Sequence, residues 1–251
     1  MRRLFAFGCS FTEYPWPTWA EIAGLGFDEF YNCGHCGAGN QLIMGRILEA
    51  DKKMQFTQDD LVLVMWTSTP RIDMYHKGSW RLGGNLEHHC FYDEQWLDSY
   101  WSQDLGVYTS WQTITAAKQY LNSRGIAHKF MSAFDFDYRA EDYHRPEAAE
   151  QFLADIRAMI DLPAEHTWAE QRFKDTDYYH MINESHPDRH PSIKMHLAYL
   201  REFLPRVVVD DVERYTNYWE TLVDRTSLKA CKESFELQNY HPTKRRIHWF
   251  L

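Results

Sequence analysis

Two segments that lie far apart in the sequence carry residues suited to hydrolytic chemistry. The first is Phe7-Gly8-Cys9-Ser10-Phe11-Thr12, where Ser10 follows an apolar run and a tight turn can hold its hydroxyl at the end of a strand. A serine acts as a nucleophile when a base takes its proton and nearby donors stabilise the oxyanion on the attacked carbonyl. Ser10 is therefore a candidate nucleophile, although serine after a strand is also a common turn residue.

The second segment is Ser185-His186-Pro187-Asp188-Arg189-His190-Pro191-Ser192, which precedes a helical pattern that starts near Ile193. His190 is a candidate general base that can reach a nucleophile from a second loop. Asp188, two residues earlier, can hold one imidazole tautomer and stabilise the charged form of the ring. A surface loop with a helix cap is the structural alternative for the same residues.

Three motifs, taken in order, resemble the SGNH (GDSL) hydrolase superfamily. They are Phe7-Gly8-Cys9-Ser10-Phe11-Thr12, Asn32-Cys33-Gly34-His35-Cys36-Gly37 and Asp188-Arg189-His190-Pro191-Ser192. The resemblance implies a three-layer α/β/α, flavodoxin-like fold with a parallel sheet, a nucleophile at Ser10, and no metal or organic cofactor. It also implies an oxyanion hole built from the amides of Ser10 and Gly37, with Asn40 lining the same turn.

The sequence departs from the family pattern in three places. Cys9 replaces the aspartate that usually precedes the serine. The family has a further motif, Gly-x-Asn-Asp, after the central strand, and its asparagine supplies a side-chain amide. That asparagine is missing after the expected strand over 61–65, so Ser68 falls nearest its place and Arg71 is an alternative electrophilic contact. The last motif is usually Asp-x-x-His, whereas this chain has Asp188-x-His190.

These departures leave two questions open at the catalytic base. Asp188 is in doubt as the triad acid, and His190 would then work as a dyad with Ser10. His186 is a rival base, because Asn183-x-x-His186-Pro187 imitates the family spacing with an amide in place of the acid. We prefer His190 because Asp188 stands beside it.

The resemblance implies a serine esterase that forms an acyl-enzyme and often removes acyl groups, such as acetyl, from carbohydrates. Ten Trp and 15 Tyr favour an aromatic surface for a glycan or another partner. A degenerate glycan-binding or virion-associated protein and an acyltransferase are the alternatives. The segment Trp16-Pro17-Thr18-Trp19 resembles short proteins of tailed phages and marine bacteria.

Strand and helix patterns alternate around these residues. Strands are expected over 4–7, 29–32, 61–66 and 126–133, and helices over 16–24, 41–50, 109–122, 152–160, 193–204 and 212–222. This alternation predicts a single α/β domain over 1–251, with a parallel sheet between two helical layers. An aromatic-rich excursion is expected over about 74–108, and a C-terminal helix and tail over about 205–251.

Composition and charge limit the classes of partner and the cellular location that we expect for this protein. The formal net charge of −9 disfavours nucleic acid as a partner, and no apolar run approaches the roughly 18 residues of a membrane span. The start lacks the apolar core of a secretory signal, so we expect a cytoplasmic protein, in a host cell or virion if phage-encoded. Cys33-x-x-Cys36 and His88-His89-Cys90 are weak metal candidates, and we expect no metal site.

Overall fold

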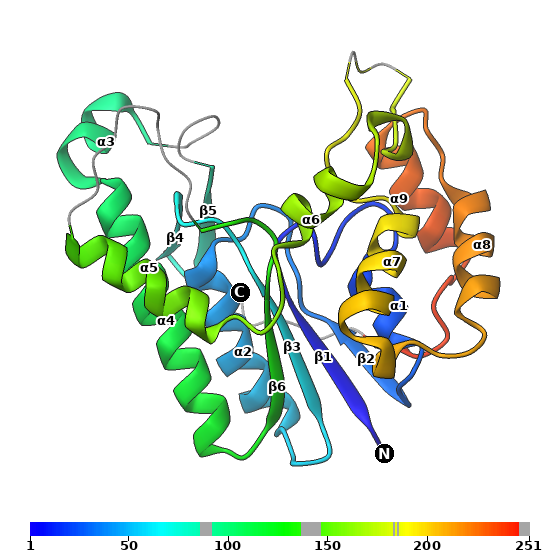
Figure 1. Ribbon diagram of the computed structural model, residues 1–251, viewed down its shortest axis with the longest axis horizontal. Helices are drawn as coiled ribbons and strands as arrows, with labels where there is room; N and C mark the ends of the chain where they lie inside the picture. The colour runs from blue at the N-terminus through cyan, green and yellow to red at the C-terminus, as the bar shows by residue number, and fades with distance from the viewer. Residues whose placement is uncertain (86–91, 137–146, 183, 185, 246–251) are drawn as a thin grey trace.

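The computed structural model describes residues 1–85, 92–136, 147–182, 184 and 186–245. Within them, five parallel strands form one sheet in the order β6-β3-β1-β2-β7. The strands are β1 (Arg3–Gly8), β2 (Glu29–Asn32), β3 (Leu61–Trp66), β6 (Ala127–Ser132) and β7 (Lys244–Arg245). Helices cover both faces of the sheet (Figure 1), so the predicted three-layer α/β fold is confirmed.

The order of the strands follows the flavodoxin-like pattern for the first four of them. β1 lies at the centre between β2 and β3, and β6 extends the sheet beyond β3. β7 instead pairs with β2, where Phe30 lies opposite Lys244 and Tyr31 opposite Arg245. The fifth strand therefore joins the β2 edge of the sheet.

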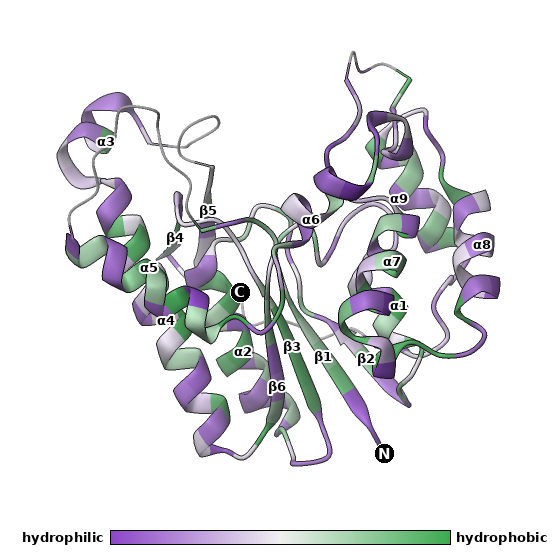
Figure 2. Ribbon diagram, in the orientation of Figure 1, coloured by the Kyte–Doolittle hydropathy of each residue, from purple (hydrophilic) through white to green (hydrophobic). Residues whose placement is uncertain are grey.

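The central strands form where the sequence has continuous apolar runs. In β3 only the first residue, Leu61, is partly exposed, and the rest of the strand is buried. β1 is equally apolar after Arg3, and both strands are green along most of their length in Figure 2. Runs of this kind suit strands that are covered on both faces, because neither face needs polar side chains.

Two groups of helices supply the outer layers. One face carries α2 (Asn40–Met54) and α4 (Gln103–Ser123), with α5 (Glu147–Met159) packed on α4. The other face carries α1 (Trp19–Gly24) and α7 (Ile193–Phe203), followed outward by α8 (Val212–Leu222) and α9 (Leu228–Leu237). Among the described residues, no helix combines the length and apolarity needed to cross a bilayer.

The segment over 74–108, for which the sequence predicted an excursion without assigned secondary structure, contains regular elements. An antiparallel hairpin joins β4 (Arg71–His76) to β5 (Ser79–Asn85), and α3 (Glu94–Tyr100) follows. The hairpin turn uses Lys77 and Gly78, both with positive φ, at 50° and 83°. A turn of this kind usually has the sequence Asn-Gly or Asp-Gly, so the dipeptide Lys77-Gly78 does not predict it.

Three further elements were missed in polar or short segments. α6 (Glu165–Arg172) lies in a polar segment for which no helix was predicted. α9 has only two buried residues, Cys231 and Phe235. β7 has two residues, and nothing local to it predicts a strand. These elements depend on tertiary partners more than on their own periodicity.

Candidate active site

Ser10, His190 and Asp188 lie together at the carboxyl end of β1. Ser10 Oγ is 2.8 Å from His190 Nε2, although 180 residues separate them in sequence. His190 Nδ1 is 2.7 Å from Asp188 Oδ1. With Nδ1–H donating to the carboxylate, Nε2 is the acceptor for the Ser10 hydroxyl. This is the hydrogen-bond order of a Ser–His–Asp triad.

The turn after β1 presents the Ser10 hydroxyl. The amides of Thr12 and Glu13 both donate to the Cys9 carbonyl, which closes a tight turn around Ser10. Gly8 ends the strand, and a Cβ there would lie 2.0 Å from Thr12 Oγ1 and 2.8 Å from the Met65 carbonyl. Glycine is therefore required for the turn to pack this closely against β3.

The shortened spacing between Asp188 and His190 is compatible with the triad geometry. Asp188 Oδ1 accepts from the His190 amide at 2.9 Å as well as from the His190 ring. The Asp188 side chain thus turns back toward the backbone of its own loop, and from that position it contacts the imidazole of His190. The loop is fixed by the Asp188 amide donating to the Tyr179 carbonyl and by Trp16 Nε1 donating to the Pro191 carbonyl at 2.9 Å.

The surroundings of Asp188 keep it ionised. Burial by itself would raise the pKa of this carboxyl, but its hydrogen bond with His190 and the charge of that ring outweigh burial. The Tyr14 hydroxyl and the His190 amide also donate to it, and the net effect lowers its pKa below the usual value. An ionised Asp188 can stabilise the imidazolium that forms when His190 takes a proton.

The turn that contains Gly37 lies beside the nucleophile turn. The His35 amide donates to the Gly8 carbonyl, and the Ala38 amide closes the turn on the His35 carbonyl. Gly37 has φ of +82°, which glycine adopts without strain. Among the described residues, neither the Ser10 amide nor the Gly37 amide donates a hydrogen bond. Both amides are thus available for an oxyanion.

The β4–β5 hairpin holds this turn from outside, which the sequence did not suggest. Asp73 of β4 accepts from the amides of Gly39 and Leu42 at 3.1 and 3.0 Å, at the start of α2. Arg71 of β4 donates from Nη1 to the Ala38 carbonyl at 3.1 Å, and its guanidinium lies over the Phe134 ring. The first strand of the hairpin therefore helps to shape the predicted oxyanion hole.

Asn40 and Ser68 occupy different settings near this turn. The Asn40 side chain donates to the Thr67 carbonyl and Ser110 Oγ and accepts from the Thr67 amide. It thus joins α2 to the end of β3. Both N–H groups of its side chain already have acceptors, so it has none left to donate to an oxyanion. Ser68 is half-buried after β3, and its role remains a prediction.

The other histidine and metal candidates lie outside this arrangement. His186 is exposed. His196 is buried in α7 and pairs through Nδ1 with Glu165 at 2.6 Å, so it has a packing role. His88, His89 and Cys90 lie outside the described residues.

A buried ionic network lies behind the nucleophile turn. Glu21 of α1 accepts from Lys244 Nζ at 2.9 Å, from Asn32 Nδ2 at 2.7 Å and from the Thr18 amide at 3.1 Å. Asn32 and Thr18 also donate to the Thr12 carbonyl, each at 2.7 Å. The network thus ties β7 and α1 to the turn that carries Ser10.

His241 adds a pH dependence to the stability of this region. Burial lowers its pKa to about 4. Nε2–H donates to the Glu21 carbonyl at 2.8 Å, and Nδ1 accepts from the Thr243 amide at 3.3 Å, so the neutral ring is the one that fits. As the pH falls from about 6.5, the unfolded chain takes up a proton at this residue and the folded chain does not, so stability is lost until about pH 4.

His241→Gln should therefore show a weaker loss of stability between pH 7 and pH 4.5 than the wild type. Urea denaturation at several pH values measures the difference, which we expect to reach about 3 kcal/mol at the acid end. Parallel stability curves for the two proteins would contradict this assignment.

The fold and this site together have the layout of an α/β serine hydrolase. No protein-family model matches the sequence, and no curated protein matches it. Among solved structures, the chain is similar to a lipolytic protein of the G-D-S-L family from Veillonella parvula, with TM-score 0.44, 15% identity and coverage of 82% of this chain and 100% of the other.

A GDSL-like lipase from Bacteroides thetaiotaomicron gives TM-score 0.44 and 14% identity, over 84% of this chain and 88% of that one. Both carry the name of the family that the sequence motifs resemble.

Proposed function

We propose that this protein is a serine ester hydrolase of the SGNH type. The observation that carries the proposal is the chain of hydrogen bonds from Ser10 Oγ through the His190 ring to Asp188, with distances of 2.8 and 2.7 Å. A nucleophile, a base and an orienting acid in contact in this order are what acyl transfer through serine requires.

In the first half-reaction, Ser10 Oγ forms a bond to the ester carbonyl carbon while its proton passes to His190 Nε2. The electron pair of the carbonyl moves onto oxygen, and the amides of Ser10 and Gly37 stabilise the oxyanion. When the oxyanion collapses, the bond to the alcohol breaks and His190 returns the proton to the leaving oxygen. The acyl group is then held on Ser10.

In the second half-reaction, water takes the place of the alcohol. His190 accepts a proton from water as the water oxygen attacks the acyl carbon, and the Ser10–acyl bond breaks with return of that proton to Ser10 Oγ. The products are a free acid and the original enzyme. An acceptor alcohol in place of water gives acyl transfer through the same steps, so product analysis distinguishes the two outcomes.

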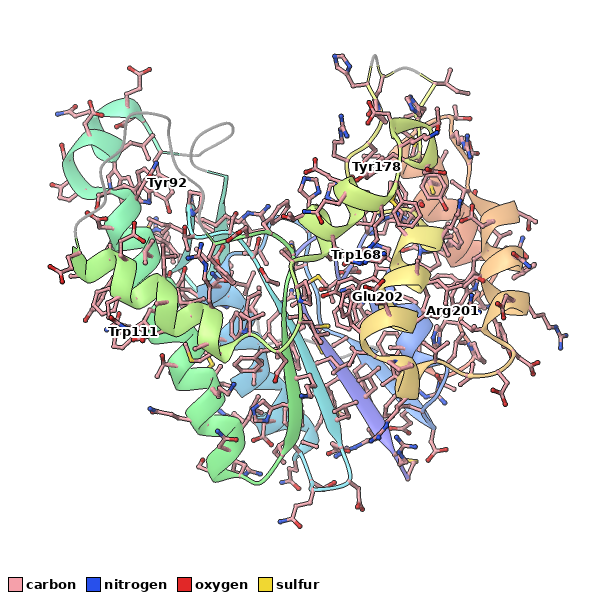
Figure 3. The ribbon with its side chains drawn as sticks, in the orientation of Figure 1. Tyr92, Trp111, Trp168, Tyr178, Arg201 and Glu202 are labelled. Carbon is pink, nitrogen blue, oxygen red and sulfur yellow. The ribbon has the colours of Figure 1, made fainter. Side chains whose placement is uncertain are left out.

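We further propose an acylated carbohydrate as the substrate, with acetyl as the acyl group. Support comes from α3 and the residue before its N-cap: Tyr92 stacks on Trp96 at 4.1 Å between ring centroids, and Tyr100 is 68% exposed. The exposed ring of Tyr100 can pack on the apolar face of a sugar ring, and the half-buried Tyr92–Trp96 pair lies close by in sequence. Figure 3 places Tyr92 on one side of the carboxyl edge of the sheet and Tyr178 on the other.

Other aromatic residues in and beside the excursion pack on one another. Trp111, labelled in Figure 3, packs on Phe152 at 4.7 Å, and Tyr108 contacts both rings. Trp80 packs against Tyr75. These residues therefore form clusters separate from Tyr92, Trp96 and Tyr100, on which the substrate proposal rests.

Turnover of p-nitrophenyl acetate and labelling by a fluorophosphonate test the proposed chemistry. The wild type should turn over and carry the label on Ser10, located by mass spectrometry, and Ser10→Ala should lose both. Cys36→Ser is the matched control, because Cys36 is an exposed thiol that an activated ester can acylate. It should retain turnover and the label.

Two results would overturn the proposal. One is a wild type with neither turnover nor label, which would favour a binding protein on the same fold. The other is a label that persists in Ser10→Ala. Acetate release from acetylated polysaccharide, measured in wild type and in Trp96→Ala, then tests the carbohydrate proposal separately from ester hydrolysis.

A further inference from the structure

Tyr14 contacts both Asp188 and His190. Its hydroxyl donates to Asp188 Oδ2 at 2.7 Å, on the carboxylate oxygen that does not face the imidazole. Its ring stacks on the His190 ring, with centroids 3.7 Å apart and planes at 19°. One side chain thus contacts the acid and the base of the site at once, from a position four residues after Ser10.

The segment around Tyr14 is built to hold it there. Trp16 packs edge-on against the Tyr14 ring at 4.6 Å and donates from Nε1 to the Pro191 carbonyl. Trp16 also contacts Tyr179, whose carbonyl accepts from the Asp188 amide. The loop after the nucleophile and the loop with the base are therefore joined at several points, and Tyr14 lies where they meet.

Each contact has a defined consequence for the reaction. Asp188 Oδ1 already accepts from the ring and the amide of His190, so the bond from Tyr14 to Oδ2 completes the polar contacts of the carboxylate and fixes its plane. A stacked phenol ring fixes the plane of the imidazole. It also attracts the imidazolium, which forms in the reaction when His190 takes the proton from Ser10.

We infer that Tyr14 is a positioning residue for catalysis, which orients Asp188 through its hydroxyl and supports the charged form of His190 through its ring. The inference rests on the proposed function and adds to it a fourth side chain. It also explains how an acid only two residues before the base works here. The shorter spacing leaves the second carboxylate oxygen without a partner from its own loop, and Tyr14 supplies one.

Tyr14→Phe and Tyr14→Leu separate the two contributions. Tyr14→Phe retains the stacked ring and loses the hydrogen bond, so kcat for p-nitrophenyl acetate should fall about tenfold with KM unchanged. Tyr14→Leu loses both the ring and the hydrogen bond, and its kcat should fall about a hundredfold. Tyr199→Phe is the matched control, because it removes a hydroxyl that donates to the Pro163 carbonyl away from the site. Its kcat should stay within about twofold.

The pH profile distinguishes positioning from a general loss of structure. Without the donor on Oδ2, more negative charge remains on the oxygen that faces the imidazolium, so the acidic limb of kcat should move to higher pH in Tyr14→Phe. Asp188 and His166 of α6 are the titratable neighbours of His190, and Arg189 pairs with Asp175 at 3.0 Å. All four side chains are unchanged in Tyr14→Phe.

A titration of the His190 ring by NMR keeps this test independent of turnover. If the wild type hydrolyses no ester, the proposed function fails, and a His190 midpoint that still moves upward in Tyr14→Phe supports the contact with the acid–base pair. A kcat within twofold of wild type together with an unmoved pH profile would overturn the inference. In an inactive protein, an unmoved His190 midpoint would overturn it.

Discussion

His190→Ala should lower kcat for p-nitrophenyl acetate by about 10³-fold to 10⁵-fold. Ser10 Oγ has His190 Nε2 as its proton acceptor at 2.8 Å, and without it the hydroxyl must attack the ester while still protonated. In serine hydrolases, removing the base costs about as much as removing the nucleophile, because the two act as a unit. The rate of fluorophosphonate labelling should fall in parallel.

His186→Ala is the matched control for this prediction. His186 lies in the same loop four residues earlier, and its side chain is exposed. Its loss should leave kcat within about twofold of wild type. If His186→Ala abolished turnover and His190→Ala did not, the base would be misassigned and the observed hydrogen bond would have no catalytic role. Melting temperatures of both variants exclude unfolding as the cause.

Lys244→Met should destabilise the protein by about 3 kcal/mol or more, because it leaves the Glu21 carboxylate buried without its cation. The Glu21 side chain is 3% exposed and that of Lys244 is 23% exposed. Burial alone would raise the Glu21 pKa, but the charge and hydrogen bond of Lys244 outweigh it and lower the pKa. The pair therefore contributes stability above the unfolded pKa of Glu21, and this contribution is lost as the pH falls.

Urea denaturation at pH 7 and pH 4 tests both the size and the sign of this effect. At pH 4 the unpaired Glu21 of Lys244→Met takes up a proton more easily, so the gap from wild type should shrink. Adding Glu21→Gln to Lys244→Met should recover much of the stability at pH 7. Lys229→Met, which removes an exposed partner of Glu233, should change nothing measurable. A loss below about 1 kcal/mol in Lys244→Met would contradict the prediction.

The sequence by itself determined the layers of the fold and the candidate residues Ser10, Asp188 and His190. Short apolar runs such as 61–66 suit strands that are covered on both faces, and their alternation with helical patterns predicts a parallel sheet with helical crossovers. Ser10 and His190 were found from their motifs, because a turn after a strand and a loop before a helix are local features. His190 was preferred to His186, and the structure places it against Ser10.

Contacts between distant segments decided the rest. β7 pairs with β2 through two residues, and Glu21 is buried because Lys244 reaches it from more than 200 positions away. The hairpin that begins at Arg71 shapes the Gly37 turn through side chains that no periodicity marks. Tyr14 carried no signal of its own. Tyr14 contacts Asp188 only because two loops 174 residues apart in the chain fold onto each other. A single sequence does not show which distant segments come into contact.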